Sequence, residues 1–483
     1  MGDLQVAGVV LAAGEGRRLK SDLPKVLHPA AGRPLVAHVV AALQPLDLAR
    51  RVVVTSARRD EIAGALEEAG LADDLVYAIQ DPPRGTADAV AIALEAAGDP
   101  ALVLVVNGDT PLMRTETLER LLEAQRATGA AAAIVTAELD DPGGYGRVVR
   151  TAEGLVDRVV EDRDASGSER GLNEVNAGFY VFDALLLAQM LQKVDTSNAQ
   201  NEYYLTDVVG VLRAEGHQVV AVIADGSEIG GVNDRAQLAA VERALRARAT
   251  ERWMAEGVTI IDPATTYIDA AVVIDRDATI RPFTFLEGAT YIGGGASVGP
   301  QVRIVDSVVG PGAEVSSFSV VRGSEIGDGA SVGPFASLRA GTRLARGARV
   351  GSFVETKQTT LGEGSKANHL AYLGDAEIGA GVNIGAGTIT CNWDGREKHR
   401  TVIEDDAYIA SDTMLVAPVR IGKRAATGAG SVVRDDVPDD ALAVGVPARI
   451  IEGKGNRMSG RADADRPEEA ADGTVEDADE ADA

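Results

Sequence analysis

The apolar positions follow one pattern in the first half of the chain and a different one in the second half. In the first half, continuous apolar runs at residues 6–13 and 101–106 are typical of strands buried on both faces. Between them, residues 37–43 and 87–97 have helical periodicity and few helix breakers. Such alternation predicts βαβ units around a mostly parallel sheet. Ligands of such sheets bind beyond the carboxyl ends of the strands.

In the second half the apolar positions repeat every six residues, a spacing that neither a helix nor a flat strand produces alone. The repeat runs through Ile292, Val298 and Ile304, through Val332, Leu338, Leu344 and Val350, and through Ile403, Ile409, Leu415 and Ile421. A flat strand with a turn every six residues explains this spacing, and three such sides close a triangular coil. Each aliphatic residue then stacks on the one a coil below, at about 4.8 Å. We therefore predict a left-handed parallel β-helix of hexapeptide repeats.

These patterns divide the chain into four segments. An α/β domain with a Rossmann-like sheet is expected over residues 1–235, and the β-helix domain over residues 257–452. Residues 236–256 between them are charged, rich in alanine and free of Gly and Pro, which predicts a linker helix. Residues 453–483 form an acidic tail with few apolar side chains, so we expect the tail to be disordered.

Polar residues interrupt the six-residue register at residues 353–360 and again at residues 391–401. We expect both segments to project from the coil as loops. Because loops are where chemistry is commonly grafted onto a fold, both segments are candidates for a functional site.

Charge and cysteine content exclude several classes of function. The chain of 483 residues has 73 acidic and 47 basic residues, a formal charge of −26, which argues against a general nucleic-acid binder. Its single cysteine, Cys391, excludes an intrachain disulfide and is typical of a reducing compartment. No apolar run approaches the roughly 18 residues of a membrane helix, and the N-terminus lacks the basic region of a signal peptide. We expect a soluble, cytoplasmic protein with no nucleic-acid or membrane partner.

A glycine-rich segment with sequence LAAGEGRRL, residues 11–19, follows the first predicted strand, and Lys25 lies close behind it. Its backbone N–H groups can cradle phosphates, and Arg18 and Lys25 add positive charge. It is not a dinucleotide fingerprint, because Arg17 and Arg18 stand where a closely packed glycine is needed. It is not a P-loop either, because the GxxxxGK[ST] spacing is absent. A plain strand-to-helix turn is the alternative.

The second buried strand ends in Asn107-Gly108-Asp109. A carboxylate there is well placed to hold Mg²⁺ on a nucleotide phosphate, because Mg²⁺ prefers few carboxylates together with phosphate oxygens. The alternative is that Asp109 caps the following turn. Asn233 is a candidate for a second oxygen ligand, although its signal is weak by itself.

Taken together, these motifs resemble those of nucleotidyltransferases that make nucleotide sugars from sugar 1-phosphates. The matching segments are residues 11–19, Pro24-Lys25, Gln80, Gly85-Thr86, 107–109, 144–147, Glu161, 174–178 and 231–233. With the hexapeptide repeats and the segments 365–379 and 383–392, residues 5–440 resemble the bacterial bifunctional N-acetylglucosamine-1-phosphate uridylyltransferase/glucosamine-1-phosphate N-acetyltransferase family. The resemblance implies acetylation of glucosamine 1-phosphate by acetyl-CoA, then transfer of UMP from UTP. It also implies Mg²⁺ as cofactor and a homotrimer.

The same resemblance assigns residues to the first active site. The residues that would bind the UDP-sugar are Leu11, Ala12, Ala13, Gly14, Lys25, Gln80, Gly85, Thr86, Asn107, Gly108, Asp109, Gly146, Glu161, Asn176 and Asn233. Asp109 and Asn233 would hold Mg²⁺, and Arg18 and Lys25 would place positive charge where negative charge accumulates. This transfer needs no general base, because the attacking phosphate is already ionised at neutral pH.

Acetyl transfer does need a base, because the sugar ammonium must lose a proton before it attacks a thioester. His369 is the candidate, since an imidazole titrates at about 6.5, although a surface or packing histidine is the alternative. By resemblance, the residues that would bind glucosamine 1-phosphate are Arg339, Lys357, Tyr372, Asn383, Lys398 and, with less support, Glu355. The residues that would border acetyl-CoA are Ala386, Asn392, Trp393, Ser411, Ala429 and Arg449.

The acetyl-CoA end departs from the family pattern at two places. Trp393 stands where the family commonly has Tyr, and Gly445 stands where an Arg is common. We expect Arg449 to contact the cofactor instead. Two other interpretations stay open: a nucleotidyltransferase whose β-helix has only a structural or regulatory role, and a non-enzymatic scaffold.

Overall fold

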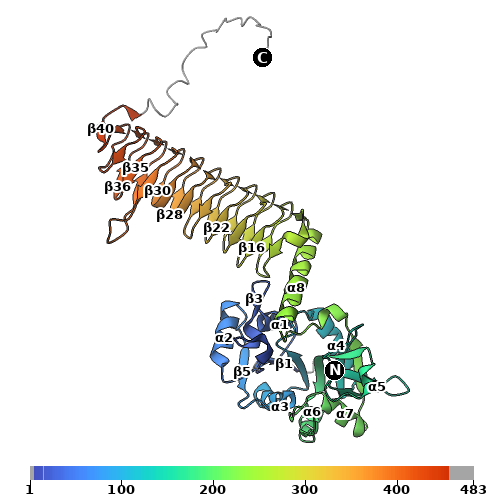
Figure 1. Cartoon of the computed structure of the whole chain (residues 1–483). Helices are drawn as coiled ribbons and strands as arrows, with labels where there is room; N and C mark the ends of the chain where they lie inside the picture. The colour runs from blue at the N-terminus through green and yellow to red at the C-terminus, as the bar shows by residue number, and fades with distance from the viewer. Residues whose placement is uncertain (1–4, 15, 456–483) are drawn as a thin grey trace, which may run out of the picture. The chain divides into compact units, whose positions relative to one another are not determined.

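The computed structural model describes residues 5–14 and 16–455. The chain divides into two compact units between Ala249 and Thr250, inside the long helix α8 (Arg235–Ala255) (Figure 1). α8 occupies the range in which the sequence predicts a linker helix. The predicted disordered tail lies outside the described residues, except for residues 453–455. In the part of the chain that the structure describes, no helix has both the length and the apolar character needed to cross a membrane.

The first unit contains a mostly parallel sheet in the order β11-β7-β10-β6-β1-β4-β5. These strands are β1 (Val6–Leu11), β4 (Arg50–Thr55), β5 (Leu75–Ile79), β6 (Leu102–Asn107), β7 (Ala132–Glu138), β10 (Glu174–Asp183) and β11 (Val219–Ile223). β1 pairs in parallel with both β4 and β6, whereas β10 is antiparallel to β6 and β7. A small antiparallel pair, β8 (Arg147–Arg150) and β9 (Val156–Val160), joins the sheet through β10.

Helices cover both faces of this sheet. One apolar layer contains buried residues of α1 (Leu35–Leu43), α2 (Arg59–Glu68) and α4 (Thr115–Thr128). The other contains buried residues of α3 (Thr86–Ala97), α6 (Ala184–Leu191) and α7 (Asp207–Ala214). Along β1, successive side chains join opposite layers, because side chains alternate across a strand. The continuous apolar runs of the sequence are therefore strands with two buried faces, as predicted.

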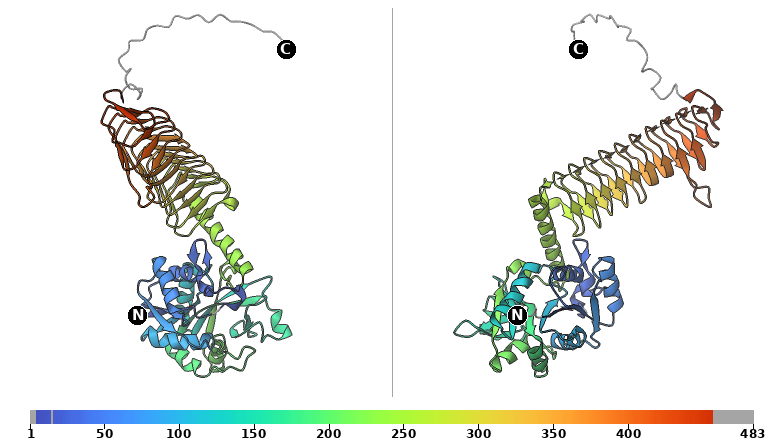
Figure 2. Two further views of the ribbon diagram at one scale, coloured as in Figure 1. Left: turned by 60° about the vertical axis from the view of Figure 1, so that its left-hand side comes forward. Right: turned by 180° about the vertical axis from the view of Figure 1, so that it is seen from behind.

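The second unit is a parallel β-helix, shown as a stack of coils in Figures 1 and 2. Its short strands run from β12 (Thr259–Ile260) to β40 (Arg449–Ile451). From β12 to β27 (Arg349–Ser352), every third strand pairs with its counterpart in the next coil to form one face. One coil takes 17 or 18 residues, since Val332 pairs with Val350 and Val350 pairs with Ala367. The aliphatic residues of the predicted six-residue repeat are buried inside the coils. The predicted fold class is therefore confirmed.

The prediction that residues 353–360 project as a loop is wrong. They lie largely in β28 (Glu355–Leu361), which pairs along its length with β30 (Tyr372–Ile378) and turns from one face to the next. Thr356 and Thr359 take the inward positions, where Thr356 bonds to the Thr342 hydroxyl at 2.9 Å and Thr359 donates to the Leu373 carbonyl at 2.8 Å. Hydrogen bonds inside the coil thus allow polar residues to replace aliphatic ones without leaving the register.

The second polar segment, residues 391–401, does project from the coil. Ile384 pairs with Ile409 in the next coil, so this coil takes 25 residues instead of 17 or 18. The additional residues form a loop in which Trp393 pairs with Lys398, and the loop extends from the stack in orange in Figure 2. The predicted loop at residues 391–401 is therefore present, between β32 (Ile389–Cys391) and β33 (Thr401–Ile403).

Candidate functional site

Two adjoining cavities open where β1 and β6 end, at the point where the chain crosses from one side of β1 to the other. Their volumes are about 260 and 720 Å³, and Leu11, Thr86, Asn107 and Asp109 line both. The predicted residues that line one cavity or both are Leu11, Ala13, Gly14, Arg18, Lys25, Gln80, Gly85, Thr86, Asn107, Asp109, Gly146, Glu161, Asn176 and Asn233. The fold thus gathers motifs that are widely separated in sequence.

Two predicted residues do not line these cavities. Ala12 is buried in the apolar layer beneath α1 and α4. Gly108 donates its backbone N–H to the Leu11 carbonyl at 2.9 Å, and a Cβ there would lie only 2.9 Å from the same oxygen. Both therefore support the shape of the site from behind its lining. Their direct contact with a ligand stays a prediction.

The segment before α3 forms part of the wall of the larger cavity. Gly85 has φ of 120°, and a Cβ there would lie 2.4 Å from the Tyr203 carbonyl oxygen, so a side chain is excluded. The amide of Gln80 donates to the Gly85 carbonyl at 2.9 Å and to Asp88 at 2.7 Å. The Thr86 hydroxyl accepts the Leu205 N–H at 2.9 Å. Gln80 and Thr86 therefore fix this loop as well as line the cavity.

Lys25 connects the two residues proposed from sequence as metal ligands. Its ammonium forms an ion pair with Asp109 and donates a hydrogen bond of 2.8 Å to Asn233 Oδ1. The backbone also joins these segments, because the Val232 N–H donates to the Asp109 carbonyl at 3.0 Å. A carboxylate and an amide oxygen thus face one cationic atom. Oxygen donors arranged in this way suit Mg²⁺, so the residues present fit the expected cofactor.

At the other end of the site, Glu161 is held among polar groups and is largely buried. Burial raises the pKa of Glu161, and the nearby carboxylates of Asp207 and Asp164 act in the same direction. The Thr206 hydroxyl opposes this shift by donating a hydrogen bond of 3.0 Å to Glu161 Oε1. Asn176 donates to the Tyr180 hydroxyl at 2.6 Å. This end of the cavity offers acceptors and donors suited to the hydroxyls of a sugar.

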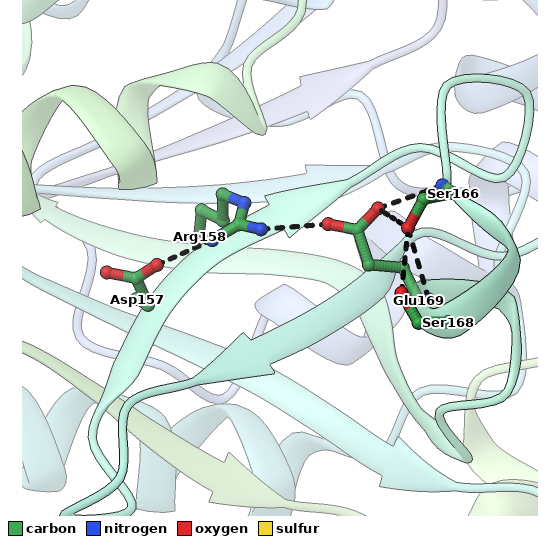
Figure 3. Close-up of polar contacts among 5 residues, drawn as sticks. All are labelled: Asp157, Arg158, Ser166, Ser168 and Glu169. Atoms are coloured by element: carbon green, nitrogen blue, oxygen red, sulfur yellow. Dashed lines mark hydrogen bonds and ion pairs between the residues drawn. The ribbon is translucent and has the colours of Figure 1, made fainter.

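The loop that carries Glu161 and Arg163 is held at its far end by the polar network in Figure 3. Arg158 of β9 bonds to Asp157 at 2.7 Å and to Glu169 at 2.8 Å. Glu169 also closes a capping box with Ser166 at the start of α5 (Gly167–Arg170). Three donors lower the pKa of Glu169 to about 2, so the network stays intact at neutral pH.

Several lining residues were not predicted from the sequence. These are Val26, Pro83, Ala89, Thr110, Gly143, Gly144, Tyr145, Arg163, Ala177, Gly178, Tyr180, Gln200, Glu202, Leu205, Thr206, Ile229, Gly231 and Gln237. Some stood inside motifs already recognised, such as residues 144–147 and 174–178. The segment containing Gln200, Leu205 and Thr206 had no comparable signal, because only tertiary packing brings it against α3 and Glu161.

On the β-helix, the predicted phosphate-binding side chains come from neighbouring coils and from the projecting loop. Arg339 bonds to Glu355 at 2.9 Å, and Glu355 stands beside Tyr372 in the pairing of β28 with β30. The ammonium of Lys398 lowers the pKa of Lys357, and Arg339 acts in the same direction. Lys357 and Lys398 therefore lie close together with Arg339 nearby, and Asp375 opposes part of their charge. Such a group of cations suits a phosphate dianion.

The other predicted residues of this unit have defined positions. His369 ends β29 (Lys366–His369), is exposed and pairs with Ser352 of the preceding coil, while Asn383 pairs with Lys366. In the loop, Asn392 donates to Asp375, and Trp393 is 57% exposed.

Three small residues mark one corner of the last coils. The Ala386 carbonyl accepts the Asp412 N–H at 2.7 Å, and the Ser411 carbonyl accepts the Gly430 N–H at 2.9 Å. Ala386, Ser411 and the residue before Gly430, Ala429, therefore stack in a column. Arg449 lies on exposed β40, which folds back antiparallel to β39 (Leu442–Val444), and it pairs with Val444.

Comparison with known proteins identifies the class first. Residues 8–175 match the family model described as the MobA-like NTP transferase domain, so the first unit is a nucleotidyltransferase domain. Joined to a β-helix, it defines a two-domain transferase.

Matches over nearly the whole chain then give the family. The chain is 47% identical over 438 residues to the bifunctional protein GlmU of Carboxydothermus hydrogenoformans, covering 90% of this chain and 97% of that one. It is 48% identical to that of Thermobifida fusca, covering 92% and 93%, and 47% identical to that of Streptomyces avermitilis, covering 91% of each. The chain belongs to the GlmU family of bifunctional transferases. The predicted family and bifunctional activity are thereby confirmed.

Proposed function

We propose that the first unit transfers UMP from UTP to N-acetylglucosamine 1-phosphate, and that the β-helix unit first makes this acceptor by acetylating glucosamine 1-phosphate. The products of the uridylyl transfer are UDP-N-acetylglucosamine and pyrophosphate. The observation that carries the proposal is the convergence of Lys25, Asp109 and Asn233 where β1 and β6 end. The two substrates of this step are both anions, so the site must supply compensating positive charge.

In uridylyl transfer, an oxygen of the sugar phosphate forms a bond to the α-phosphorus of UTP while the bond to pyrophosphate breaks. Asp109 and Asn233 would hold Mg²⁺, which supplies charge neutralisation at the phosphates when bound. Arg18 and Lys25 place further positive charge beside the nucleotide phosphates and the leaving pyrophosphate. Glu161 and Asn176 orient the sugar through its hydroxyl and amide groups. No proton is transferred, because the attacking phosphate is already ionised.

In acetyl transfer, His369 accepts a proton from the ammonium of glucosamine 1-phosphate. The free amine then attacks the thioester carbonyl, the C–N bond forms, and the C–S bond breaks to release coenzyme A, whose thiolate is protonated. Arg339, Lys357 and Lys398 bind the phosphate, and their gathering on adjacent coils supports this role. Tyr372, Asn383 and Glu355 contact the sugar.

Acetyl-CoA would run along the corner formed by Ala386, Ser411 and Ala429, because small residues leave room for an extended ligand. Asn392 and Trp393 of the loop would contact the same ligand. Arg449 is proposed as an additional contact for its phosphates.

We propose a homotrimer located in the cytoplasm. Support comes from an exposed aromatic ladder on successive coils, in which Phe318 stacks on Phe335 at 4.8 Å and Phe335 stacks on Phe353 at 5.2 Å. Phe353 is 60% exposed, and Leu370, directly after His369, is 62% exposed. A second copy of the chain would remove this apolar surface from water next to His369. Light scattering should give three times the chain mass of 50.1 kDa, and a mass near that of one chain would contradict the trimer.

Pyrophosphate release from UTP and N-acetylglucosamine 1-phosphate tests the first activity. We expect release by the full-length protein with Mg²⁺, and a loss of at least 100-fold in the Asp109→Asn variant. Equal rates in the two proteins would overturn the assignment of Asp109. Acetyl transfer by the same variant provides the control for folding, because it depends on the other unit.

A further inference from the structure

Gln237 links the first turn of α8 to the segment that carries Asn233. The backbone N–H of Gln237 donates to Asp234 Oδ1 at 2.8 Å, so Asp234 caps the start of the helix. In the opposite direction, the Gln237 side-chain oxygen accepts the backbone N–H of Asn233 at 2.7 Å. This arrangement resembles a capping box, but the carboxamide reaches one residue farther back than usual, to Asn233 itself.

Three hydrogen bonds fix the position of Asn233: one to its side chain, one to the backbone of its neighbour Val232, and one to its own backbone N–H. Its side-chain oxygen faces the Lys25 ammonium at 2.8 Å, and its neighbour Val232 is hydrogen-bonded to the Asp109 backbone. The contact from Gln237 fixes the peptide N–H of Asn233, and this peptide determines where the Asn233 side chain starts. Gln237 also lines the smaller cavity together with Asp109 and Asn233.

We propose that Gln237 is a positioning residue that aims the Asn233 oxygen toward the Asp109 carboxylate and so strengthens binding of a divalent cation between them. The inference rests on the proposed function of Asp109 and Asn233. Groups that orient metal ligands through one hydrogen bond typically contribute about 10–100-fold to metal affinity. An amide side chain on a short segment depends on such support more than a carboxylate close to the end of a strand, and Asp109 lies two residues after β6.

Two substitutions separate this role from simple helix capping. Gln237→Leu removes the side-chain acceptor but keeps the backbone N–H and nearly the same volume. Asp234→Ala removes the helix cap and leaves the Gln237 carboxamide in place. Gln237→Glu restores an oxygen that can accept the Asn233 N–H and therefore serves as the conservative variant.

The experiment titrates each full-length protein with Mn²⁺ alone and follows free Mn²⁺ by electron paramagnetic resonance. We expect the Kd to rise at least fivefold in Gln237→Leu and to stay within about twofold of wild type in Asp234→Ala. In Gln237→Glu the Kd should not rise, because the acceptor is kept and the added negative charge favours the cation. In the uridylyl transfer assay, Gln237→Leu should need more Mg²⁺ for half-maximal rate while kcat at saturating Mg²⁺ stays close to wild type. Thermal melting verifies that each variant is folded.

The outcomes distinguish this inference from the proposal on which it rests. If Asp109→Asn leaves Mn²⁺ binding unchanged, the proposed metal site itself is wrong. If Asp109→Asn weakens binding but Gln237→Leu does not, only the role of Gln237 is wrong. If Asp234→Ala weakens binding as much as Gln237→Leu does, the effect is one of helix capping, and the inference is overturned.

Discussion

The Lys25 ammonium donates a 2.8 Å hydrogen bond to Asn233, a residue more than two hundred positions away in the chain. The same ammonium is paired with Asp109, so three distant segments meet at one charged atom. Lys25 and a divalent cation would use the same two oxygens. Lys25 therefore competes with the metal for these oxygens. When a cation binds and displaces the Lys25 ammonium, the ammonium becomes free to contact the nucleotide phosphates.

This relationship predicts opposite effects of Lys25→Met on metal binding and on catalysis. Without nucleotide, the variant should bind Mn²⁺ more tightly than wild type, because the ammonium no longer occupies the oxygens of Asp109 and Asn233. Its kcat/KM for UTP should nevertheless fall by about 100-fold or more, the usual cost of removing a charge at a developing phosphate. Mn²⁺ titration and pyrophosphate release measure the two effects, with exposed Lys20→Met as the control. Weaker Mn²⁺ binding in Lys25→Met would contradict the account.

The hydrogen bond between Thr206 and Glu161 predicts a change in pH dependence. Burial raises the pKa of Glu161, and the Thr206 hydroxyl counteracts this by stabilising the ionised carboxylate. Thr206→Val should therefore raise the pKa further and move the acid limb of kcat/KM for N-acetylglucosamine 1-phosphate upward by about one pH unit. Thr206→Ser keeps the hydroxyl and should leave the limb in place. A limb that moves equally in both variants would argue against the hydrogen bond.

Asp207 predicts a pH-dependent gain in stability. Burial, with smaller effects of Asp195 and Asp164, raises its pKa to about 6. Because the folded pKa lies above the unfolded value, the charged form destabilises the fold, fully above pH 6 and progressively less as the pH falls toward 4. Its place in the first turn of α7 offsets about 0.5 kcal/mol of this cost.

Asp207→Asn should therefore raise the free energy of unfolding by about 1 kcal/mol at pH 7.5, after allowance for the partial exposure of the group. The corresponding rise in Tm, about 2–4 °C, should disappear near pH 4. Thermal melts at both pH values measure the effect. Asp60→Asn, at an exposed position of α2, provides the control. A gain that is equal at both pH values would contradict the assigned pKa.

The cation cluster on the β-helix predicts a selective loss of substrate affinity. Lys357→Met and Lys398→Met should each raise the KM for glucosamine 1-phosphate about tenfold, because each removes a charge facing the phosphate. The KM for acetyl-CoA should change little, and uridylyl transfer by the same proteins should be unaffected. Unchanged KM values for glucosamine 1-phosphate would show that the phosphate binds elsewhere.

Most of the fold could be predicted from apolar periodicity. Val9 and Val10 are buried on opposite faces of one strand, and Ile292 and Val298 are buried inside successive sides of a coil, as their spacing indicates. The prediction failed where polar residues form hydrogen bonds inside the coil. Thr356 and Thr359 look like an interruption in the sequence, but their hydroxyls find partners in adjacent coils.

The candidate site was predictable where short motifs follow strands, as at Leu11 and Asn107. It was not predictable where the lining comes from packing between distant segments. Thr206 reaches Glu161 only because α7 packs against β9, and Gln237 reaches Asn233 only because a helix begins there. In the sequence, the residues around Thr206 and Gln237 look like ordinary helix starts. Their spacing does not indicate the contacts with Glu161 and Asn233.

The presence of two active sites in one chain can be tested by measuring thiol release from acetyl-CoA when glucosamine 1-phosphate is added to the purified full-length protein without UTP. We predict release by the wild-type protein, and its loss in His369→Ala while uridylyl transfer by that variant stays normal. An absence of thiol release from folded wild-type protein would show that the β-helix has no acetyltransferase site, and full release by His369→Ala would show that His369 is not the base.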